Sequence, residues 1–371
     1  MSKVKVDEIE SSSGGGLTAK ITNLPPGNRN LLINGSQIVS QRTTSATGKT
    51  TTGYHCTDRF RFVDNNIGTF TLAQSTDAPT GFAKSLRLDC TTADTSIAAG
   101  DYLSVDQAIE GFNVQQLDYG LSSAKSITIS FYVKSTTTGT YTLEIYLNDG
   151  DYFNSKTYTI SSANTWERKT ITFAGNTSNA IADDNTRGLT CNFWLSNGSN
   201  FEGGTFSDGT WHNTTNKRVH SSQVNIASST DNDWSVTGVQ LEVSDYATEF
   251  EYLSYADELR RCQRYFERVG GELGYDAIAN GMQRTTSQSL FQLSFKVPKR
   301  AAPTVTLTGD VITTDRYAFD ETITGLDAAI ASKTGLHGRA THSSVGAERR
   351  PIFLSSKNGT PYGYISFDAE L

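Results

Sequence analysis

The sequence is short of charge and of long apolar runs. Charged residues make up 19% of its 371 residues and apolar residues 36%, against roughly 25% and 45–50% in ordinary globular domains. No stretch approaches the ~20 apolar residues of a membrane span, and no signal-peptide core follows Met1, so we expect no membrane insertion and no secretory signal. The net charge of -7 argues against nucleic acid as a partner, because phosphate neutralisation needs clustered Lys and Arg.

Cysteine and histidine are also scarce. The four cysteines lie far apart without a CxxC pair, which excludes a zinc ribbon and a dithiol redox site. We expect all four to be buried as small apolar side chains, with secreted disulfides as the alternative: Cys56, Cys90, Cys191 and Cys262. None of the five histidines stands in an HExxH or HxH pattern, and no GxSxG, Walker or GxGxxG sequence follows an expected strand. The sequence therefore predicts no catalytic residue, no metal site and no cofactor, and we expect a protein that is not an enzyme.

Acidic and oxygen-rich segments leave two alternatives to that expectation. Paired carboxylates could cleave a glycosidic bond, and the candidates are Asp183 with Asp184 and Glu249 with Glu251. We interpret the first pair as part of a loop and the second as a strand end. Two segments are dense enough in oxygen ligands for calcium but complete no twelve-residue binding loop: Asn148–Asp151 and Asp231–Asp233. We interpret both as ordinary turns and keep a structural calcium ion as the alternative.

What the sequence does have is Ser, Thr, Asn and 32 Gly, together with 10% aromatic residues. This composition suits half-exposed β-sheets and is too rich in aromatics for a disordered chain. Apolar residues alternate with period two in several segments, among them Ile127–Val133, Tyr141–Leu147 and Val239–Val243. Many such segments separated by turn residues predict an all-β fold, an antiparallel jelly-roll sandwich over residues 29–253.

The regions before and after this sandwich differ from it. Residues 1–28 contain a Ser-Gly tract and a Pro-Pro-Gly turn, and we interpret them as an extended N-terminal arm that orders on a partner. Apolar residues at three- and four-residue steps from Tyr255 to Val269 predict one linking helix over 254–270, capped by Ser254 with Asp257. Residues 271–371 return to short alternating segments, including 316–319, and predict a smaller C-terminal β domain.

Strand parity predicts a surface of aromatic and polar side chains on the sandwich. If the apolar residues of each strand face the core, the alternate ones face outward, and these are Tyr132, Glu144, Tyr146, Asn192 and Trp194. Trp211, in a loop rich in Gly, Asn and Thr, could join them. Rings beside hydrogen-bonding groups suit the face of a sugar, so we predict these six residues as a glycan-binding site. The alternative is that a neighbouring subunit or a loop covers this face.

Several segments also resemble a family of bacteriophage tail-fibre and virion structural proteins that is common in marine phages. The most specific match runs through the sequences GVQLEV, ATEFEY and ELRRCQRYF. Further matches lie before and after it, at Asn30–Arg42, Asp58–Phe60, Gln223–Trp234 and Ile365–Leu371. Residues 63–211 match only in the rhythm of their strands. The resemblance implies a jelly roll like those of carbohydrate-binding modules, carried on a trimeric phage appendage, and it implies no catalytic residue.

These inferences define one functional hypothesis and two alternatives. The first is a homotrimeric tail fibre or tail appendage, located in the virion and assembled in the cytoplasm of the bacterial host. It would dock to other phage tail proteins through residues 1–28 and adsorb to host-surface glycan, without nucleic acid or membrane insertion. The second is a purely structural collar or adaptor between tail and fibres. The third, more distant, is a polysaccharide depolymerase.

Overall fold

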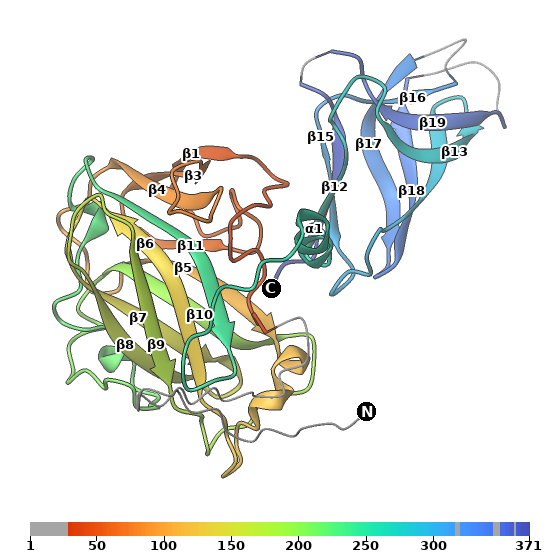
Figure 1. The fold of residues 1–371 in the computed structure, drawn as a ribbon. Helices are drawn as coiled ribbons and strands as arrows, with labels where there is room; N and C mark the ends of the chain where they lie inside the picture. The colour runs from red at the N-terminus through yellow and green to blue at the C-terminus, as the bar shows by residue number, and fades with distance from the viewer. Residues whose placement is uncertain (1–28, 316–319, 344–348, 360) are drawn as a thin grey trace, which may run out of the picture.

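The computed structural model describes residues 29–315, 320–343, 349–359 and 361–371 (Figure 1). The predicted N-terminal arm, residues 1–28, and the strand predicted at 316–319 lie outside the described residues. Within the described part, the chain is all-β apart from one α-helix and five short 3-10 turns: η1 (Gly111–Asn113), η2 (Gln115–Leu117), η3 (Asn148–Gly150), η4 (Thr215–Lys217) and η5 (Ile226–Ser228). No helix within these residues is long and apolar enough to cross a membrane.

Two antiparallel sheets form the larger part of the molecule. The six-stranded sheet has the order β1-β3-β4-β11-β6-β9, with strands β1 (Ser45–Lys49), β3 (Thr69–Ser75), β4 (Ser85–Thr92), β6 (Ile127–Ser135), β9 (Glu167–Phe173) and β11 (Asp233–Glu242). The five-stranded sheet has the order β2-β5-β10-β7-β8, with strands β2 (Arg61–Asn65), β5 (Tyr102–Glu110), β7 (Gly139–Leu147), β8 (Tyr152–Ile160) and β10 (Arg187–Asn197). From β5 to β11 the chain passes repeatedly between the two sheets, which is the jelly-roll sandwich that the sequence predicts.

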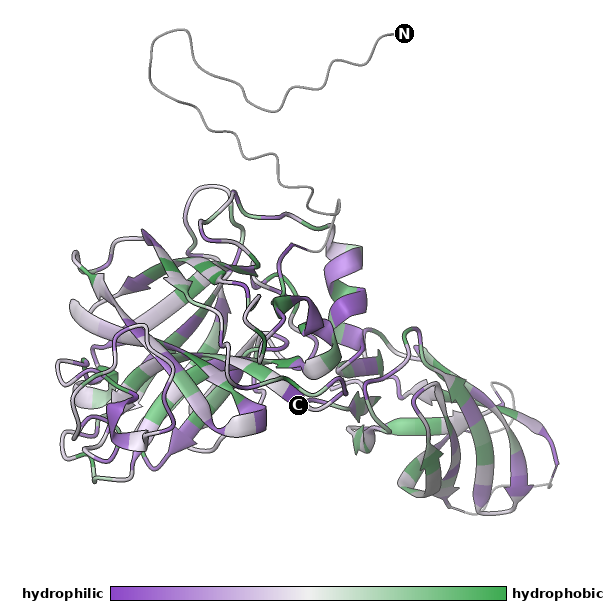
Figure 2. Cartoon of the chain, turned by 90° about the horizontal axis from the view of Figure 1, so that it is seen from below, coloured by the Kyte–Doolittle hydropathy of each residue, from purple (hydrophilic) through white to green (hydrophobic). Residues whose placement is uncertain are grey.

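Alternate side chains of both sheets fill the space between them. Phe131 of β6 and Phe193 of β10 meet edge to face, with ring centroids 5.1 Å apart, and Phe193 lies 5.6 Å from Trp234 of β11. These rings are fully buried, and complete burial of a large apolar side chain contributes about 1.5–3 kcal/mol. Figure 2 shows the resulting alternation of hydrophobic and hydrophilic residues along the strands. The four cysteines are free and buried, as the sequence predicts.

The helix is shorter than the sequence predicts. Helix α1 (Tyr255–Gln263) begins as expected, with the Ser254 hydroxyl accepting a hydrogen bond from the Asp257 amide at 3.2 Å. The predicted extent of 254–270 is wrong, because strand β12 (Phe266–Gly270) follows directly and pairs with β20 (Tyr364–Asp368). The apolar period continues through Phe266 and Val269, but hydrogen bonds to a strand about 100 residues later decide their conformation.

The C-terminal part consists of a small sheet and a closed barrel. Strands β12, β20 and β15 (Thr304–Thr308) form a three-stranded antiparallel sheet. The barrel has the order β13-β14-β18-β17-β16-β19 and closes by pairing of β19 with β13; its strands are β13 (Ala277–Thr285), β14 (Gln288–Ser294), β16 (Val311–Thr314), β17 (Asp320–Ala331), β18 (Gly335–His342) and β19 (Pro351–Ser356). Together they enclose a second hydrophobic core, separate from that of the sandwich, as expected for a smaller β domain.

The C-terminal end of the chain lies beside α1, between the sandwich and the barrel (Figure 1). Charged side chains attach the C-terminal part to the sandwich there. We call the contacts of Arg42, Arg59, Arg300, Asp368 and Glu370 the seam. Buried Arg59 forms an ion pair with Glu370, and the Arg42 guanidinium lies 2.9 Å from the Asp368 carboxylate. The Arg300 guanidinium donates to the Ala369 carbonyl at 2.8 Å and, on the sandwich side, to the carbonyl of residue 185 at 3.0 Å. The seam therefore joins segments that lie at opposite ends of the described chain.

Candidate functional site

The outer face of the five-stranded sheet carries a row of polar side chains, one from each strand. The strand register places them side by side in the order Arg61, Asp106, Asn192, Glu144 and Ser155. Residues directly opposite each other in antiparallel strands point to the same face. Arg61 forms an ion pair with Asp106, and the Asn192 amide nitrogen lies 3.4 Å from a Glu144 carboxylate oxygen. The sheet thus presents donors and acceptors across its full width.

A long loop between β10 and β11 covers this face. It is fixed to the edge strand β8 by backbone hydrogen bonds: the His212 amide donates to the Phe153 carbonyl at 3.0 Å, and the Gly209 amide donates to the Ser155 carbonyl at 2.8 Å. Isolated bridges also join Ser155 to Asp208 and Thr140 to Gln223. We call residues 198–223 the cover loop.

Arg218 of the cover loop is bound to Glu144 of the polar row. Its Nε and Nη2 atoms donate to the two carboxylate oxygens of Glu144 at 2.8 and 2.7 Å, and Glu144 is 0% exposed. Burial opposes the charge of the guanidinium, but the adjacent carboxylate outweighs this effect, and the pKa of Arg218 is raised. Two-point pairing in a buried position is the strongest form of such an ion pair.

Aromatic rings surround the Arg218 guanidinium. Its central carbon lies 4.0 Å from the ring centroid of Phe153, 5.1 Å from that of Trp194 and 5.5 Å from that of Tyr146, which are cation–π distances. Tyr146 and Phe153 are stacked at 5.0 Å, and Trp194 lies 5.7 Å from Tyr102. The guanidinium therefore occupies a slot between ring faces of the kind that would accept a flat polar ligand.

Several buried polar atoms on this face make no hydrogen bond to any described residue. They are Ser104 Oγ, Ser155 Oγ, Asn192 Oδ1, Trp194 Nε1 and His212 Nε2. A buried polar atom without a partner costs about 1–3 kcal/mol. The face under the cover loop therefore retains hydrogen-bonding capacity that the polypeptide does not use.

The structure groups four of the six residues that the sequence predicts as a glycan site. Glu144, Tyr146, Asn192 and Trp194 share the outer face of the five-stranded sheet, as strand parity predicts. The expectation that this face is open to solvent is wrong for three of them: Glu144, Trp194 (1% exposed) and Asn192 (7% exposed) are buried, whereas Tyr146 is half-buried. The structure agrees with the alternative prediction, a loop that covers this face, because Arg218 and its neighbours fill the space above the strands. Glycan binding by these residues stays a prediction.

The other two predicted residues lie elsewhere. Tyr132 belongs to β6, in the six-stranded sheet, and its ring contacts Phe82 at 5.4 Å between centroids. Phe82 also contacts Phe250 and Tyr252 at 5.0 and 5.5 Å; we call these four residues the open aromatic group. The Trp211 ring packs against Tyr119 at 5.7 Å and donates its Nε1 hydrogen to the Ala174 carbonyl at 2.8 Å. The prediction of one shared surface is therefore wrong for Tyr132 and Trp211.

Arg218, Phe153 and Tyr102 belong to this site and are missing from the sequence-based prediction. Phe153 occupies the outer position opposite Tyr146 on β8. The parity argument applied to β8 would have found it. No sequence pattern around Arg218 marks it as a site residue. Its role follows only from the folded structure, in which the buried Glu144 carboxylate requires a cationic partner.

Side chains of the two oxygen-rich turns form hydrogen bonds or ion pairs with other residues of the chain. Asn148 accepts a hydrogen bond from the Thr190 hydroxyl at 2.8 Å, and Asp149 accepts one from the Ala182 amide at 3.0 Å. Asp233 lies 3.0 Å from the Arg87 guanidinium. Among the residues that the structure describes, no group of three or more His, Cys, Asp or Glu side chains could hold a metal ion.

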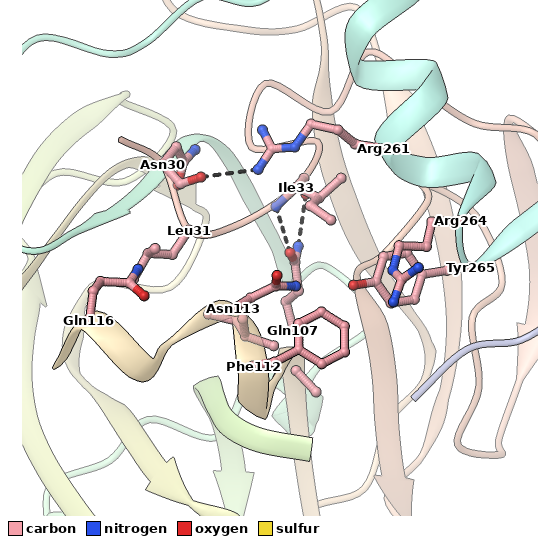
Figure 3. A pocket seen from close by; sticks show the side chains of 12 residues that line it. Asn30, Leu31, Ile33, Gln107, Phe112, Asn113, Gln116, Arg261, Arg264 and Tyr265 are labelled. Atoms are coloured by element: carbon pink, nitrogen blue, oxygen red, sulfur yellow. Dashed lines mark hydrogen bonds between the residues drawn. The ribbon is translucent and has the colours of Figure 1, made fainter. Parts of the chain in front are cut away.

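A separate pocket of about 590 Å³ lies between the sandwich and the helix (Figure 3). Four segments line it: the N-terminal residues Asn30, Leu31 and Ile33; the end of β5 with Gln107, Ala108 and Ile109; the turns η1 and η2 with Phe112, Asn113 and Gln116; and, from α1 and the residues after it, Arg261, Arg264 and Tyr265. None of these residues is predicted from the sequence as part of a binding site.

Comparisons with known proteins give only weak likenesses. No protein-family model matches the sequence, and no curated protein matches it. Among solved structures, the enzymatically active domain of tailspike protein 4 from bacteriophage CBA120 is 14% identical with a TM-score of 0.31, over 58% of this chain and 22% of that chain. A putative sugar-binding protein from Bacteroides thetaiotaomicron is 12% identical with a TM-score of 0.33, over 58% and 100%. A family 11 carbohydrate-binding module from Clostridium thermocellum is 10% identical with a TM-score of 0.27, over 56% and 98%. The fold of this chain rests on the strand order given above and not on these likenesses.

Proposed function

We propose that this chain is a non-enzymatic structural protein of a phage tail, a fibre or similar appendage that adsorbs to glycan on the host surface. The segments from Asn30 to Arg42 and from Gln223 to Phe266 that resemble phage tail-fibre and virion proteins support the virion part of this proposal. In it, residues 1–28 dock to other tail proteins, and three copies assemble into the appendage. Single-site sugar binding is weak, and three linked sites would raise the avidity by ~10²–10⁴.

The observation that carries the glycan part is the outer face of the five-stranded sheet. Stacked rings suit the C–H face of a pyranose, and the unpaired polar atoms of Asn192, Trp194 and Ser155 suit its hydroxyl groups. The half-buried Tyr146 stands beside the covered centre, and we assign it the first contact with glycan. Further contact requires the Arg218 side chain to leave the slot between the rings.

The test is binding of the full-length chain to an array of bacterial surface polysaccharides. We expect Tyr146→Ala to weaken binding at least tenfold, since a stacked aromatic ring contributes about 0.5–1.5 kcal/mol beyond its buried area. Tyr246→Ala is the matched control, because Tyr246 is an exposed tyrosine outside this face. Equal binding by the Tyr146 variant would contradict the assigned site. No binding by the wild-type protein would contradict adsorption altogether.

The second candidate function is that of a structural collar or adaptor. The covered face and the seam favour it, because a connector must transmit force and needs no accessible sugar site. Tight capture of the full chain by tail proteins, lost on deletion of residues 1–28, together with absence of glycan binding, would support it. A monomeric mass in solution would count against the trimer in both cases.

The depolymerase alternative has less support. Glu251 accepts a hydrogen bond from the Asn30 amide at 2.9 Å and so holds the N-terminal segment against the sandwich. Release of oligosaccharide that is abolished by Glu251→Gln or Asp183→Asn would nevertheless restore this alternative.

A further inference from the structure

The pocket beside α1 is electrically balanced. Arg264 donates through Nε and Nη2 to both carboxylate oxygens of Glu110 at 2.7 Å, and the Tyr265 hydroxyl donates to the same carboxylate at 2.6 Å. The Arg261 guanidinium lies 3.4 Å from the Glu258 carboxylate. Each arginine of the pocket therefore has a buried acidic partner, and the cavity offers little attraction to an anion.

Side chains of β5 and α1 bind the backbone of the N-terminal segment beside the pocket. The Gln107 amide group donates to the Ile33 carbonyl at 2.9 Å and accepts from the Ile33 amide at 2.7 Å (Figure 3). Arg261 donates to the carbonyls of Asn30 and Leu32 at 3.1 and 3.3 Å. These side chains occupy backbone groups that an extended peptide would need for strand pairing.

The groups that remain available are side chains on the turn opposite the helix. Phe112 is 38% exposed, and the Arg264 guanidinium lies 5.4 Å from its ring centroid. The side-chain amides of Asn113 and Gln116 are exposed and make no hydrogen bond to a described residue. The Gln115 side chain holds this turn by donating to the Gly111 carbonyl at 3.0 Å and to the Ile181 carbonyl at 3.2 Å. The Phe112 ring and the two amides, each with donor and acceptor atoms, line this side of the cavity (Figure 3).

We propose that this pocket is a second binding site, for a neutral, hydroxyl-rich ligand of the size of a mono- or disaccharide. Its volume of about 590 Å³ lies within the ~300–1,000 Å³ of small-molecule sites. Leu31, Ile33 and Ile109 form apolar walls, Phe112 stacks on the C–H face of the sugar, and Asn113 and Gln116 bind its hydroxyl groups. The site is independent of the cover loop, since none of its residues belongs to 198–223.

A ligand in this pocket contacts the sandwich and the residues around α1 at once. We therefore expect it to protect two separate segments, residues 107–116 and 261–265, from amide hydrogen exchange. Binding under the cover loop would instead protect residues 144–155 and 208–218. This difference separates failure of the pocket proposal from failure of the proposed function.

The experiment uses the full-length chain with glucose, galactose, mannose, N-acetylglucosamine and the β-1,4-linked disaccharides of glucose and N-acetylglucosamine, followed by saturation-transfer NMR and hydrogen exchange. We expect at least one of these sugars to protect 107–116 and 261–265, and Phe112→Ala to weaken its binding at least tenfold. The double variant Asn113→Ala, Gln116→Ala should do the same. Leu121→Ala is the control, because Leu121 is an exposed apolar residue near this turn that does not line the pocket.

Three results would overturn the proposal. The first is that none of the sugars protects the two segments. The second is that the Phe112 and amide variants bind like the wild type. The third is that galacturonate binds more tightly than galactose, which would show that the pocket selects an anion. Because all three side chains are exposed, these variants should fold, and a circular dichroism melt checks this.

Discussion

The two outer faces of the sandwich obey the same strand parity and differ in what lies on them. The face of the five-stranded sheet carries a buried ion pair, Glu144 with Arg218, under the cover loop. The face of the six-stranded sheet carries the open aromatic group, in which Tyr252 is 61% exposed, beside a surface ion pair between Lys134 and Asp77. Parity decides the side to which a residue points, whereas a distant loop decides whether it meets solvent.

Gly238 leaves space for aromatic rings on the outer face of the six-stranded sheet. It lies at a break in the β11 register, between Thr237 and Gln240, and has a φ of 60°. A Cβ atom at this position would lie 2.6 Å from the Phe82 ring and 3.1 Å from the Tyr132 ring. The aromatic rings thus take the space that a side chain would fill, much as Arg218 fills the space on the opposite face.

The two faces should differ most in the free energy of unfolding that is lost when one cationic side chain is removed from each. Arg218→Ala leaves the buried Glu144 carboxylate without its partner, and we expect a loss of about 3–5 kcal/mol in the free energy of unfolding. Lys134→Ala leaves a carboxylate, Asp77, that is 52% exposed and can be solvated, and should cost about 0–1 kcal/mol. Urea denaturation measures both.

Neutralising Glu144 in the same protein sharpens this test. Adding Glu144→Gln to Arg218→Ala should recover part of the loss, because the buried group is then uncharged. If the two single-cation variants lose equal stability, the distinction between a covered and an open face is wrong.

Gly238→Ala should give the next largest effect. The positive φ and the contact with Phe82 together predict a loss of about 1–3 kcal/mol. Gly48→Ala is the matched control, since Gly48 has a φ of 64° but no atom within 4 Å of the added Cβ. The difference in melting temperature between the two variants isolates the destabilisation that is caused by the contact with the rings. Equal losses would mean that the rings move aside without cost.

Truncation of the most exposed ring should matter less. Tyr252→Ala removes contacts with Phe82 and Phe250 at 5.5 and 5.0 Å, and we expect a loss of about 1 kcal/mol or less. Tyr246→Ala, which removes an exposed tyrosine outside the open aromatic group, should change the unfolding midpoint still less. A loss of several kcal/mol for Tyr252→Ala would show that this group is a buried core and not an open surface.

The smallest predicted effect is a dependence on pH. Burial lowers the pKa of His212 in the cover loop below its ordinary 6.5, although the Glu144 carboxylate opposes this. At this residue the unfolded chain then binds a proton more readily than the folded one, so the contribution of His212 to stability should fall as pH drops below about 6.5. We expect the His212 contribution to change by well under 1 kcal/mol between pH 7.5 and 5.5, because the ring is partly exposed.

Two variants test the assignment of this pH effect. His212→Asn should remove the His212 contribution, measured as the difference from the wild type in urea unfolding at the two pH values, because other groups such as Asp58, whose pKa burial raises to about 6, titrate in the same range. Asp77→Asn on the open face should leave it intact, since the hydrogen bond from Lys134 lowers the pKa of Asp77 below 3.8 and moves its effect to stronger acid. An unchanged pH dependence in the His212 variant would contradict the assignment.

Local patterns predicted the strands well and their assembly less well. The period-two segments Ile127–Val133 and Tyr141–Leu147 lie within β6 and β7, with their apolar residues in the core. These neighbouring strands belong to different sheets, however, so Tyr132 and Tyr146 lie on opposite sides of the sandwich. No local signal reports which sheet a strand joins, because this depends on pairing with distant strands.

The same limit explains the helix and the site. Phe266 continues the helical period but pairs with Asp368 in a strand, and Trp194 points outward but is covered by a loop that contains Arg218. Both outcomes depend on contacts between residues far apart in the sequence. The helix start at Ser254 depends only on the next three residues and was predicted correctly.

The seam also bears on the kinetics of folding. Its ion pairs join residues separated by 311 and 326 positions, Arg59 to Glu370 and Arg42 to Asp368. Contacts of such separation form slowly, because a long stretch of chain must first be confined. The sandwich and the barrel can each collapse around their own cores beforehand. Closure of the seam is therefore expected as a late folding event, and unfolding monitored at Arg59 should begin before either hydrophobic core opens.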